Sequence, residues 1–230
     1  MNQTAAAPLT QEQIEYFLEN GYLLASGLIP DEIARKAYGA MWRNLKLDPD
    51  NPETWADAPR GHQSFKDPDL TACYTPEAMA AVAQLGDAPP EPDSYRPPGS
   101  AYCINVFPTQ DEWRPHGPHL DHTIKEHGFK TFPTPCRLAA MLFLNDVPKH
   151  GGGTLIWPKS HLKAQALARS APEKFALMWQ LGQAFRKLDI GAPVETTPKR
   201  GDILFYSIFT AHSGSMNVSS QPRFAMNVKW

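Results

Sequence analysis

The feature that most constrains the fold is a series of short β-forming segments in the second half of the chain. From about residue 100, apolar runs alternate with turns that contain glycine and proline; these runs are AYCINVF, CRLAAMLFLNDV, GGGTLIWP, GDILFYS and RFAMNVKW. β-Branched and aromatic residues favour strands, whereas glycine and proline favour turns. Many short strands in this arrangement predict a β-sandwich, barrel or jelly roll.

The first 99 residues have a different pattern, which predicts helices and loops. Thr10 and Gln13 form a capping box at the start of a helix that Gly21 is expected to end. The other elements expected here are a short strand at 22–24, a helix capped by Asp31 and running to about 45, irregular chain at 48–72, a short helix after Thr75 and a proline-rich loop at 86–99.

These two parts are expected to form one domain over residues 1–230, because the N-terminal helices have no core of their own. Residues 1–99 would be a helical and loop elaboration packed on one sheet. Residues 100–230 would be the β core, with a helical insert near 163–188. The predicted fold class is therefore mainly β with flanking helices.

The stretch HGPHLDH, residues 116–122, is the densest group of metal-binding side chains in the sequence. In an extended chain, residues i and i+2 point to the same face, so His119 and Asp121 can bind one ion while Leu120 packs on the other side. An imidazole and a carboxylate suit a divalent transition metal. The tripeptide alone is weak support, since such sequences also occur by chance.

A third ligand is available at His212, just after the segment GDILFYSIFTA. Two histidines and one carboxylate form the facial triad of non-haem Fe(II) oxygenases, which leaves coordination positions open. Those positions can take a bidentate 2-oxo acid and O₂. The sequence therefore predicts an iron site made by His119, Asp121 and His212.

A 2-oxo acid with a second carboxylate, such as 2-oxoglutarate, also needs an anchor for its far end. Arg223 follows His212 by about a dozen residues, and its planar guanidinium can bind a carboxylate through two charge-assisted hydrogen bonds. We expect the strand that begins at Arg223 to run beside the one leading to His212. Ser213 could donate its hydroxyl to the same carboxylate.

The sequence resembles the phytanoyl-CoA dioxygenase-like family of Fe(II)/2-oxoglutarate oxygenases over nearly its whole length. The resemblance is carried by LTQEQIEYFLENGYLLASGLIPDEIARKA, by HLD, by GGGTLIWPKSH and by GDILFYSIFTAHSGSMNVSSQPRFAMNVKW. It implies a double-stranded β-helix (jelly-roll, cupin-like) core, Fe(II), 2-oxoglutarate and O₂, with succinate and CO₂ as co-products. Lys159 is a departure, because the family often has glycine there.

Other residues near these motifs are weaker candidates. Thr154, Asn105 and Tyr102 could contact the co-substrate, although Asn105 and Tyr102 differ in strand parity, so that only one need face the cavity without a bulge. Trp113, His116 and Arg137 could contact substrate. The remaining histidines are expected to have plainer roles: His122 as a solvated or outer residue and His161 as part of a turn. Gly151–Gly153 lacks the spacing of a phosphate loop and predicts a hairpin turn.

The composition of the chain limits the kinds of partner that we expect it to bind. Lysine and arginine number 22 against 24 acidic residues, which argues against binding to nucleic acid or to an anionic membrane surface. The sequence shows no signal-peptide pattern and no apolar run long enough to span a membrane. Three widely spaced cysteines suggest neither a disulfide framework nor a zinc site, so we expect a cytoplasmic protein.

The predicted activity is hydroxylation of a small molecule with release of succinate and CO₂. Asp121 favours hydroxylation over halogenation, because related halogenases have a small residue in its place; desaturation or ring formation would use the same triad. Two rivals remain. One is a cupin-like metal enzyme without a co-substrate, and the other is a non-catalytic jelly roll that holds metal for structure. Arg223 argues against the first rival, in which it would have no carboxylate to bind.

Overall fold

The computed structural model describes residues 7–59, 61–86 and 95–230. The helices are α1 (Gln11–Asn20), α2 (Asp31–Leu45), α3 (Pro68–Thr71), α4 (Pro76–Leu85), α5 (Ser160–Ser170) and α6 (Met178–Phe185), with 3-10 helices η1 (Pro52–Asp57) and η2 (Lys125–His127). The strands are β1 (Tyr22–Ala25), β2 (His62–Phe65), β3 (Ala101–Val106), β4 (Leu138–Phe143), β5 (Leu155–Ile156), β6 (Val194–Glu195), β7 (Ile203–Ser207), β8 (His212–Ser213) and β9 (Arg223–Lys229). No helix in these ranges has the length and apolar character needed to cross a membrane.

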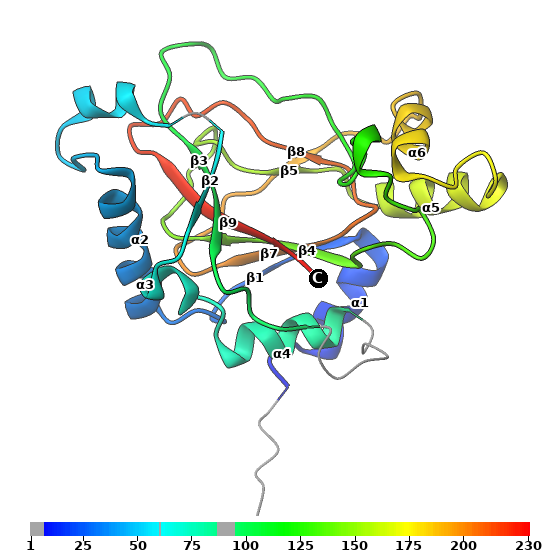
Figure 1. Cartoon of the computed structure of the whole chain (residues 1–230), viewed down its shortest axis with the longest axis horizontal. Coiled ribbons are helices and arrows are strands. Elements are labelled where there is room, and N and C mark those ends of the chain that lie inside the picture. The colour runs from blue at the N-terminus through cyan, green and yellow to red at the C-terminus, as the bar shows by residue number, and fades with distance from the viewer. Residues whose placement is uncertain (1–6, 60, 87–94) are drawn as a thin grey trace, which may run out of the picture.

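The strands form two antiparallel sheets. The larger has the order β1-β7-β4-β9-β3-β2, and the smaller has the order β6-β5-β8. Helices α1 and α4 lie on one side of the larger sheet, while β5 and β8 lie on the other (Figure 1). The predicted mainly β fold with flanking helices is therefore confirmed.

Strand alternation separates the helical layer from the space between the sheets. Along β9, Phe224, Met226 and Val228 are buried in the core that also contains α2 and α4. The alternate row on the same strand consists of Arg223, Ala225, Asn227 and Lys229. Because successive side chains point to opposite faces, this second row faces the smaller sheet and can supply a site.

The N-terminal helices follow the predicted boundaries closely. Thr10 accepts from the backbone of Gln13 in a capping box, and Gly21 ends α1 with a φ of 79°. Thr75 accepts from the backbone of Ala78 at the start of α4. The prediction that Asp31 caps α2 was wrong in detail. Pro30 occupies the cap position without a side-chain bond, and Asp31 is the first helical residue.

Two other expectations need correction. Residues 48–72 are not simply irregular, because they contain η1, the edge strand β2 and α3. β9 does not lie beside β7; it pairs with β3 and β4, and β4 separates it from β7. The insert expected near 163–188 is present as α5 and α6. Part of the proline-rich loop at 86–99 lies outside the described residues.

Candidate metal and co-substrate site

The backbone brings His119 and His212 together from distant parts of the chain. The His119 amide donates to the His212 carbonyl at 3.0 Å, and the His212 amide donates back to the His119 carbonyl at 3.1 Å. His119 makes only this isolated bridge and does not belong to a strand, contrary to the extended strand assumed from the sequence. Leu120 is buried on the opposite side, as the i, i+2 pattern predicts.

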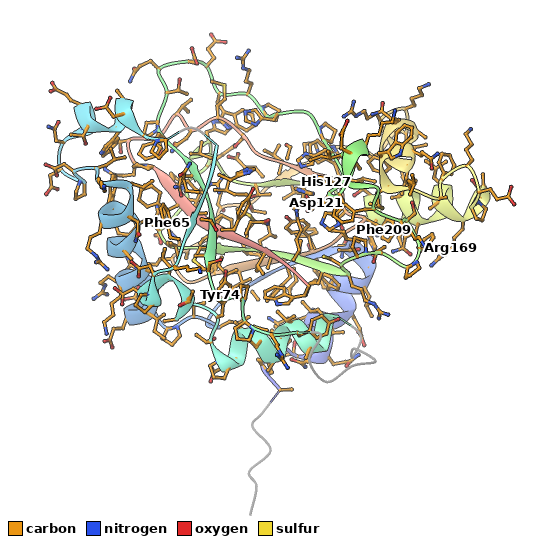
Figure 2. The ribbon with its side chains drawn as sticks, viewed as in Figure 1. Phe65, Tyr74, Asp121, His127, Arg169 and Phe209 are labelled. Atoms are coloured by element: carbon orange, nitrogen blue, oxygen red, sulfur yellow. The ribbon has the colours of Figure 1, made fainter. Side chains whose placement is uncertain are left out.

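His119, Asp121 and His212 each offer one ligand atom, and these three atoms lie within 4.8 Å of one another. His212 Nδ1 donates to the Thr210 carbonyl at 3.1 Å, which leaves Nε2 as the lone-pair nitrogen. That Nε2 lies 3.7 Å from Asp121 Oδ2. Asp121 lies toward the side of the molecule that carries α5 and α6 (Figure 2).

The electrostatics of the triad favour the protonation states that bind metal. Desolvation, reinforced by His212, lowers the pKa of His119 to about 4, although part of this residue is exposed to solvent. Burial acts to raise the pKa of Asp121, but His212 and Lys229 outweigh it and hold the pKa below its ordinary value. A neutral imidazole and an ionised carboxylate are the forms that ligate a cation.

Asp121 itself shows that a cation fits this position. Its Oδ1 accepts from Lys229 Nζ at 2.9 Å, whereas its Oδ2 is buried with no hydrogen-bond partner among the described residues. A buried carboxylate oxygen without a donor is costly unless an ion or ligand satisfies it. Together with the two imidazoles, this donor set fits a divalent transition metal such as iron.

These ligands open into a cavity of about 390 Å³. Its lining comes from both sheets and from the loops between them: Gly61, His62, Tyr102, Ile104, Asn105, Val106, His116, His119, Asp121, Met141, Thr154, Tyr206, His212, Ser213, Gly214, Ser215, Arg223, Asn227 and Lys229. A wider hollow of about 580 Å³ lies between α1, β1 and β6, but none of the three metal-ligand candidates lines it.

Arg223 lies in the same cavity although β9 is not the neighbour of β7. Its Nε donates to the Gly152 carbonyl at 3.0 Å and its Nη1 to the Ile104 carbonyl at 2.9 Å. The side chain forms no ion pair with an acid in the described part of the chain, and burial lowers its pKa to about 10. A buried guanidinium that stays charged at neutral pH without a counter-ion suits an anionic ligand such as a carboxylate.

The other predicted co-substrate residues also line the cavity. Ser213 donates its hydroxyl to the Gly214 carbonyl at 3.0 Å, and Thr154 is buried on the smaller-sheet side. The Oδ1 of Asn105 is buried without a partner among the described residues. Asn105 and Tyr102 both line the cavity, but their side chains differ in strand parity as predicted. Tyr102 is opposite Asn227 of the inward row of β9, whereas Asn105 is opposite Phe224 of the other row. Tyr102 lies at the exposed rim, where it bonds to His62.

Of the three predicted substrate residues, only one lines the cavity. His116 lines the cavity, whereas Trp113 stacks on His150 with ring centroids 4.2 Å apart. Arg137 is exposed, and neither it nor Trp113 is part of the lining. Contact of either one with substrate stays a prediction. His122 packs against Phe129 with ring centroids 4.5 Å apart, and His161 bonds to the Leu18 carbonyl at 3.1 Å.

Several lining residues were missed from the sequence, namely His62, Tyr206, Ser215, Asn227 and Lys229. Counting in steps of two from Arg223 along its predicted strand would have found Asn227 and Lys229. The Tyr206 hydroxyl accepts from Asn227 at 3.2 Å. Its pKa is raised well above the ordinary value by burial and by the negative charge of Asp121. Nothing in the sequence signals the approach of Tyr206 to that carboxylate.

The sequence model of the phytanoyl-CoA dioxygenase (PhyH) family matches residues 17–225. The chain belongs to this family. It is thus an enzyme of the non-haem iron, 2-oxoglutarate-dependent oxygenase class, and the triad found here is its candidate iron site. Among curated proteins, none matches this PhyH family member by sequence.

Solved structures with the same fold include enzymes described as non-haem and 2-oxoglutarate-dependent. The carbocyclase SnoK from nogalamycin biosynthesis has 19% identity and a TM-score of 0.67, covering 100% of this chain and 86% of its own. The epimerase SnoN has 17% identity and a TM-score of 0.62, covering 94% and 80%. EvdO2 from Micromonospora carbonacea var. aurantiaca, complexed with 2-oxoglutarate, has 13% identity and a TM-score of 0.60, covering 95% and 89%. These likenesses confirm the predicted double-stranded β-helix core.

Proposed function

We propose that this PhyH family member hydroxylates a small molecule, with iron held by His119, Asp121 and His212 and 2-oxoglutarate anchored by Arg223. One observation carries this proposal: three convergent metal-ligand atoms and a buried arginine without an acidic partner share one cavity. A metal triad alone would fit a structural ion, and a buried arginine alone would fit any anion. Side by side, they fit a metal that works together with a dicarboxylic co-substrate.

When bound, iron and 2-oxoglutarate supply the oxidising chemistry, in which the co-substrate is converted to succinate and CO₂ as O₂ is consumed. The chain supplies position and surroundings. Arg223 gives its remaining guanidinium N–H groups to the far carboxylate of the co-substrate, while its bonds to Gly152 and Ile104 fix its plane. Ser213 and Thr154 offer hydroxyl groups from the smaller sheet. The buried side chains of Tyr206 and Met141 form part of the cavity wall.

The substrate is proposed to be small, because the cavity of about 390 Å³ must also hold the co-substrate. His62, Tyr102 and His116 lie at the cavity and are placed to contact it. The solved relatives are described as a carbocyclase, an epimerase and a monooxygenase. Hydroxylation is therefore the first outcome to test, with ring formation and desaturation as outcomes of the same site.

The alternative is a cupin-like metal protein that needs no co-substrate or has no catalytic activity. It would share the triad but would leave Arg223 buried without a partner for its charge. The cost of burying an unpaired guanidinium argues against this alternative. It also predicts no Fe(II)-dependent succinate release, so a chelator would change no measured rate.

The test measures succinate release from 2-oxoglutarate, with Fe(II) and with Fe(II) removed by a chelator. We expect slow succinate formation that requires Fe(II) and disappears in His119→Ala. The matched control is His127→Ala, an exposed histidine that does not line the cavity, and it should keep the wild-type rate. The proposal fails if no iron supply gives turnover while chelation leaves the fold unchanged.

A further inference from the structure

Lys229 is a charged residue at the candidate site, but the proposed function uses it neither as a metal ligand nor as the anchor of the co-substrate. It lies on the inward row of β9, and its Nζ is 2.9 Å from Asp121 Oδ1. Both side chains are largely removed from solvent, with 27% of the Lys229 side chain and 12% of the Asp121 side chain exposed. The pair is therefore partly buried inside the cavity rather than a surface ion pair.

The two oxygens of Asp121 have different surroundings. Lys229 occupies Oδ1, whereas Oδ2 faces His212 Nε2 at 3.7 Å and has no hydrogen-bond partner among the described residues. Lys229 therefore does not take the oxygen that converges with the histidines. Its bond leaves that oxygen aimed at the ligand atoms of the other two residues.

The support that Lys229 gives comes from a rigid element. Asp121 lies in a turn, with only the isolated bridge at His119 nearby, so the backbone does little to fix its carboxylate. Lys229 is in register with Ala139 on β4, and the next residue, Trp230, exchanges two backbone hydrogen bonds with Leu138 at 2.9 and 3.1 Å. A ligand on a loop is positioned accurately when a side chain from a well-held strand binds it.

From these contacts we infer that Lys229 is a positioning residue for the metal ligand Asp121. It holds Oδ1 so that Oδ2 alone is presented between His119 and His212. This inference rests on the proposed function, because it concerns the same metal site. The competing idea is that Lys229 only balances the carboxylate charge and repels an incoming cation.

The two ideas predict opposite changes when the lysine is removed. The test titrates the full-length protein with Co(II) alone and follows its visible absorption, which reports coordination without turnover. If Lys229 positions Asp121, Lys229→Met should bind Co(II) about 10- to 100-fold more weakly, the usual cost of losing an outer partner of a metal ligand. If it acts only by repulsion, Lys229→Met should bind Co(II) as tightly as wild type or more tightly, which would overturn the inference.

Two further variants separate the hydrogen bond from the charge. Lys229→Arg keeps both the hydrogen bond and the charge. Its Co(II) affinity should be close to that of wild type, and the Co(II) absorption spectrum should be the same. Lys229→Gln keeps a donor without charge and should lie between the arginine and methionine variants. Equal affinities for Lys229→Gln and Lys229→Met would contradict a role in positioning through the hydrogen bond.

Controls keep the result interpretable. Lys149→Met removes an exposed lysine outside the cavity and should leave Co(II) binding unchanged. Circular dichroism shows whether each variant is folded, and Lys229→Gln replaces Lys229→Met if the latter is not. If wild type forms no Co(II) complex, both this inference and the proposed iron site are wrong. If wild type binds Co(II) and Lys229→Met binds it equally well, only this inference is wrong.

Discussion

Lys159 departs from a family pattern and still adopts a backbone conformation that glycine favours. The resemblance predicts glycine at this position, and Lys159 adopts a φ of 63°, the left-handed conformation that glycine favours. A non-glycine residue there costs about 1–2 kcal/mol. Its amide donates to the Asn20 carbonyl at 2.9 Å and its Nζ to Glu19 at 2.7 Å. These contacts with the end of α1 offset part of the cost of the left-handed conformation.

Arg223 leads to a prediction at the same scale. Arg223→Ala should raise the concentration of 2-oxoglutarate needed for half-maximal succinate release, because the far carboxylate loses its charged partner. Hydrogen bonds to charged groups contribute about 1.5–3 kcal/mol, so the requirement should rise roughly 10- to 150-fold. Co(II) affinity should change much less, because the hydrogen bonds that Arg223 makes in the described part of the chain go to the Gly152 and Ile104 carbonyls and not to the triad.

Measuring both affinities on one preparation distinguishes this role from a loss of structure. Arg223→Ala also leaves the Gly152 and Ile104 carbonyls without their donor, so its thermal midpoint should be measured alongside. Arg223→Lys is the matched variant, because it keeps the charge but not the planar pair of donors. An equal fall in 2-oxoglutarate and Co(II) affinity would mean that Arg223 is not the carboxylate anchor.

At the scale of the elements, Gly21 lies at the end of α1, where it packs closely against α5 and against the segment before β8. It has a φ of 79°, and a Cβ built there would lie 2.3 Å from His161 Nδ1 and 2.7 Å from Thr210 Oγ1. Gly21→Ala should therefore destabilise the fold by about 2–5 kcal/mol, the sum of backbone strain and overpacking. Urea unfolding followed by circular dichroism measures this change.

Gly27→Ala is the matched control for this prediction. Gly27 has a φ of 80°, but nothing lies within 4 Å of an added Cβ. Its substitution should cost only the backbone strain of about 1–2 kcal/mol. Similar losses at Gly21 and Gly27 would show that the close packing between α1 and His161 contributes little to stability.

The elements also show what the sequence could and could not predict. Strands β4, β7 and β9 are apolar runs that the sequence predicts, and the capping box of α1 is equally plain. Strand β2 was missed because its sequence, HQSF, is polar and half exposed at the sheet edge. β6 and β8 have two residues each, too few to show a period. The placement of β4 between β7 and β9 depends on long-range pairing, which local sequence does not encode.

The site was more predictable than the strand order. His119, Asp121, His212 and Arg223 are each identifiable by residue type and spacing, and all four reach one cavity. Arg223 was expected on a strand beside β7, which was wrong, yet its side chain still faces the cavity because β9 presents one row of residues to it. By contrast, the approach of Tyr206 and Lys229 to Asp121 depends on three separate segments meeting in space.

At the scale of the whole molecule, three histidines link folding to pH. Desolvation lowers the pKa values of His119, His122 and His161, so all three are neutral in the native state at neutral pH. In the unfolded chain their pKa values return to about 6.5. As the pH falls below that value, the unfolded state binds more protons than the native state, and stability decreases. Carboxylates with lowered pKa values, such as Asp146, add to this loss only below about pH 4.

The metal-free protein should therefore unfold at a lower urea concentration at pH 5.5 than at pH 7.5, measured with a chelator present. His161→Gln isolates one contribution, because it can keep the bond to the Leu18 carbonyl while removing the titrating ring. Its urea midpoint should fall less over the same pH interval than that of wild type. With metal bound, the dependence should steepen, since protons then also compete with the metal for His119 and His212. A wild-type midpoint that is unchanged between pH 7.5 and 5.5 would show that these rings are not held neutral by the fold.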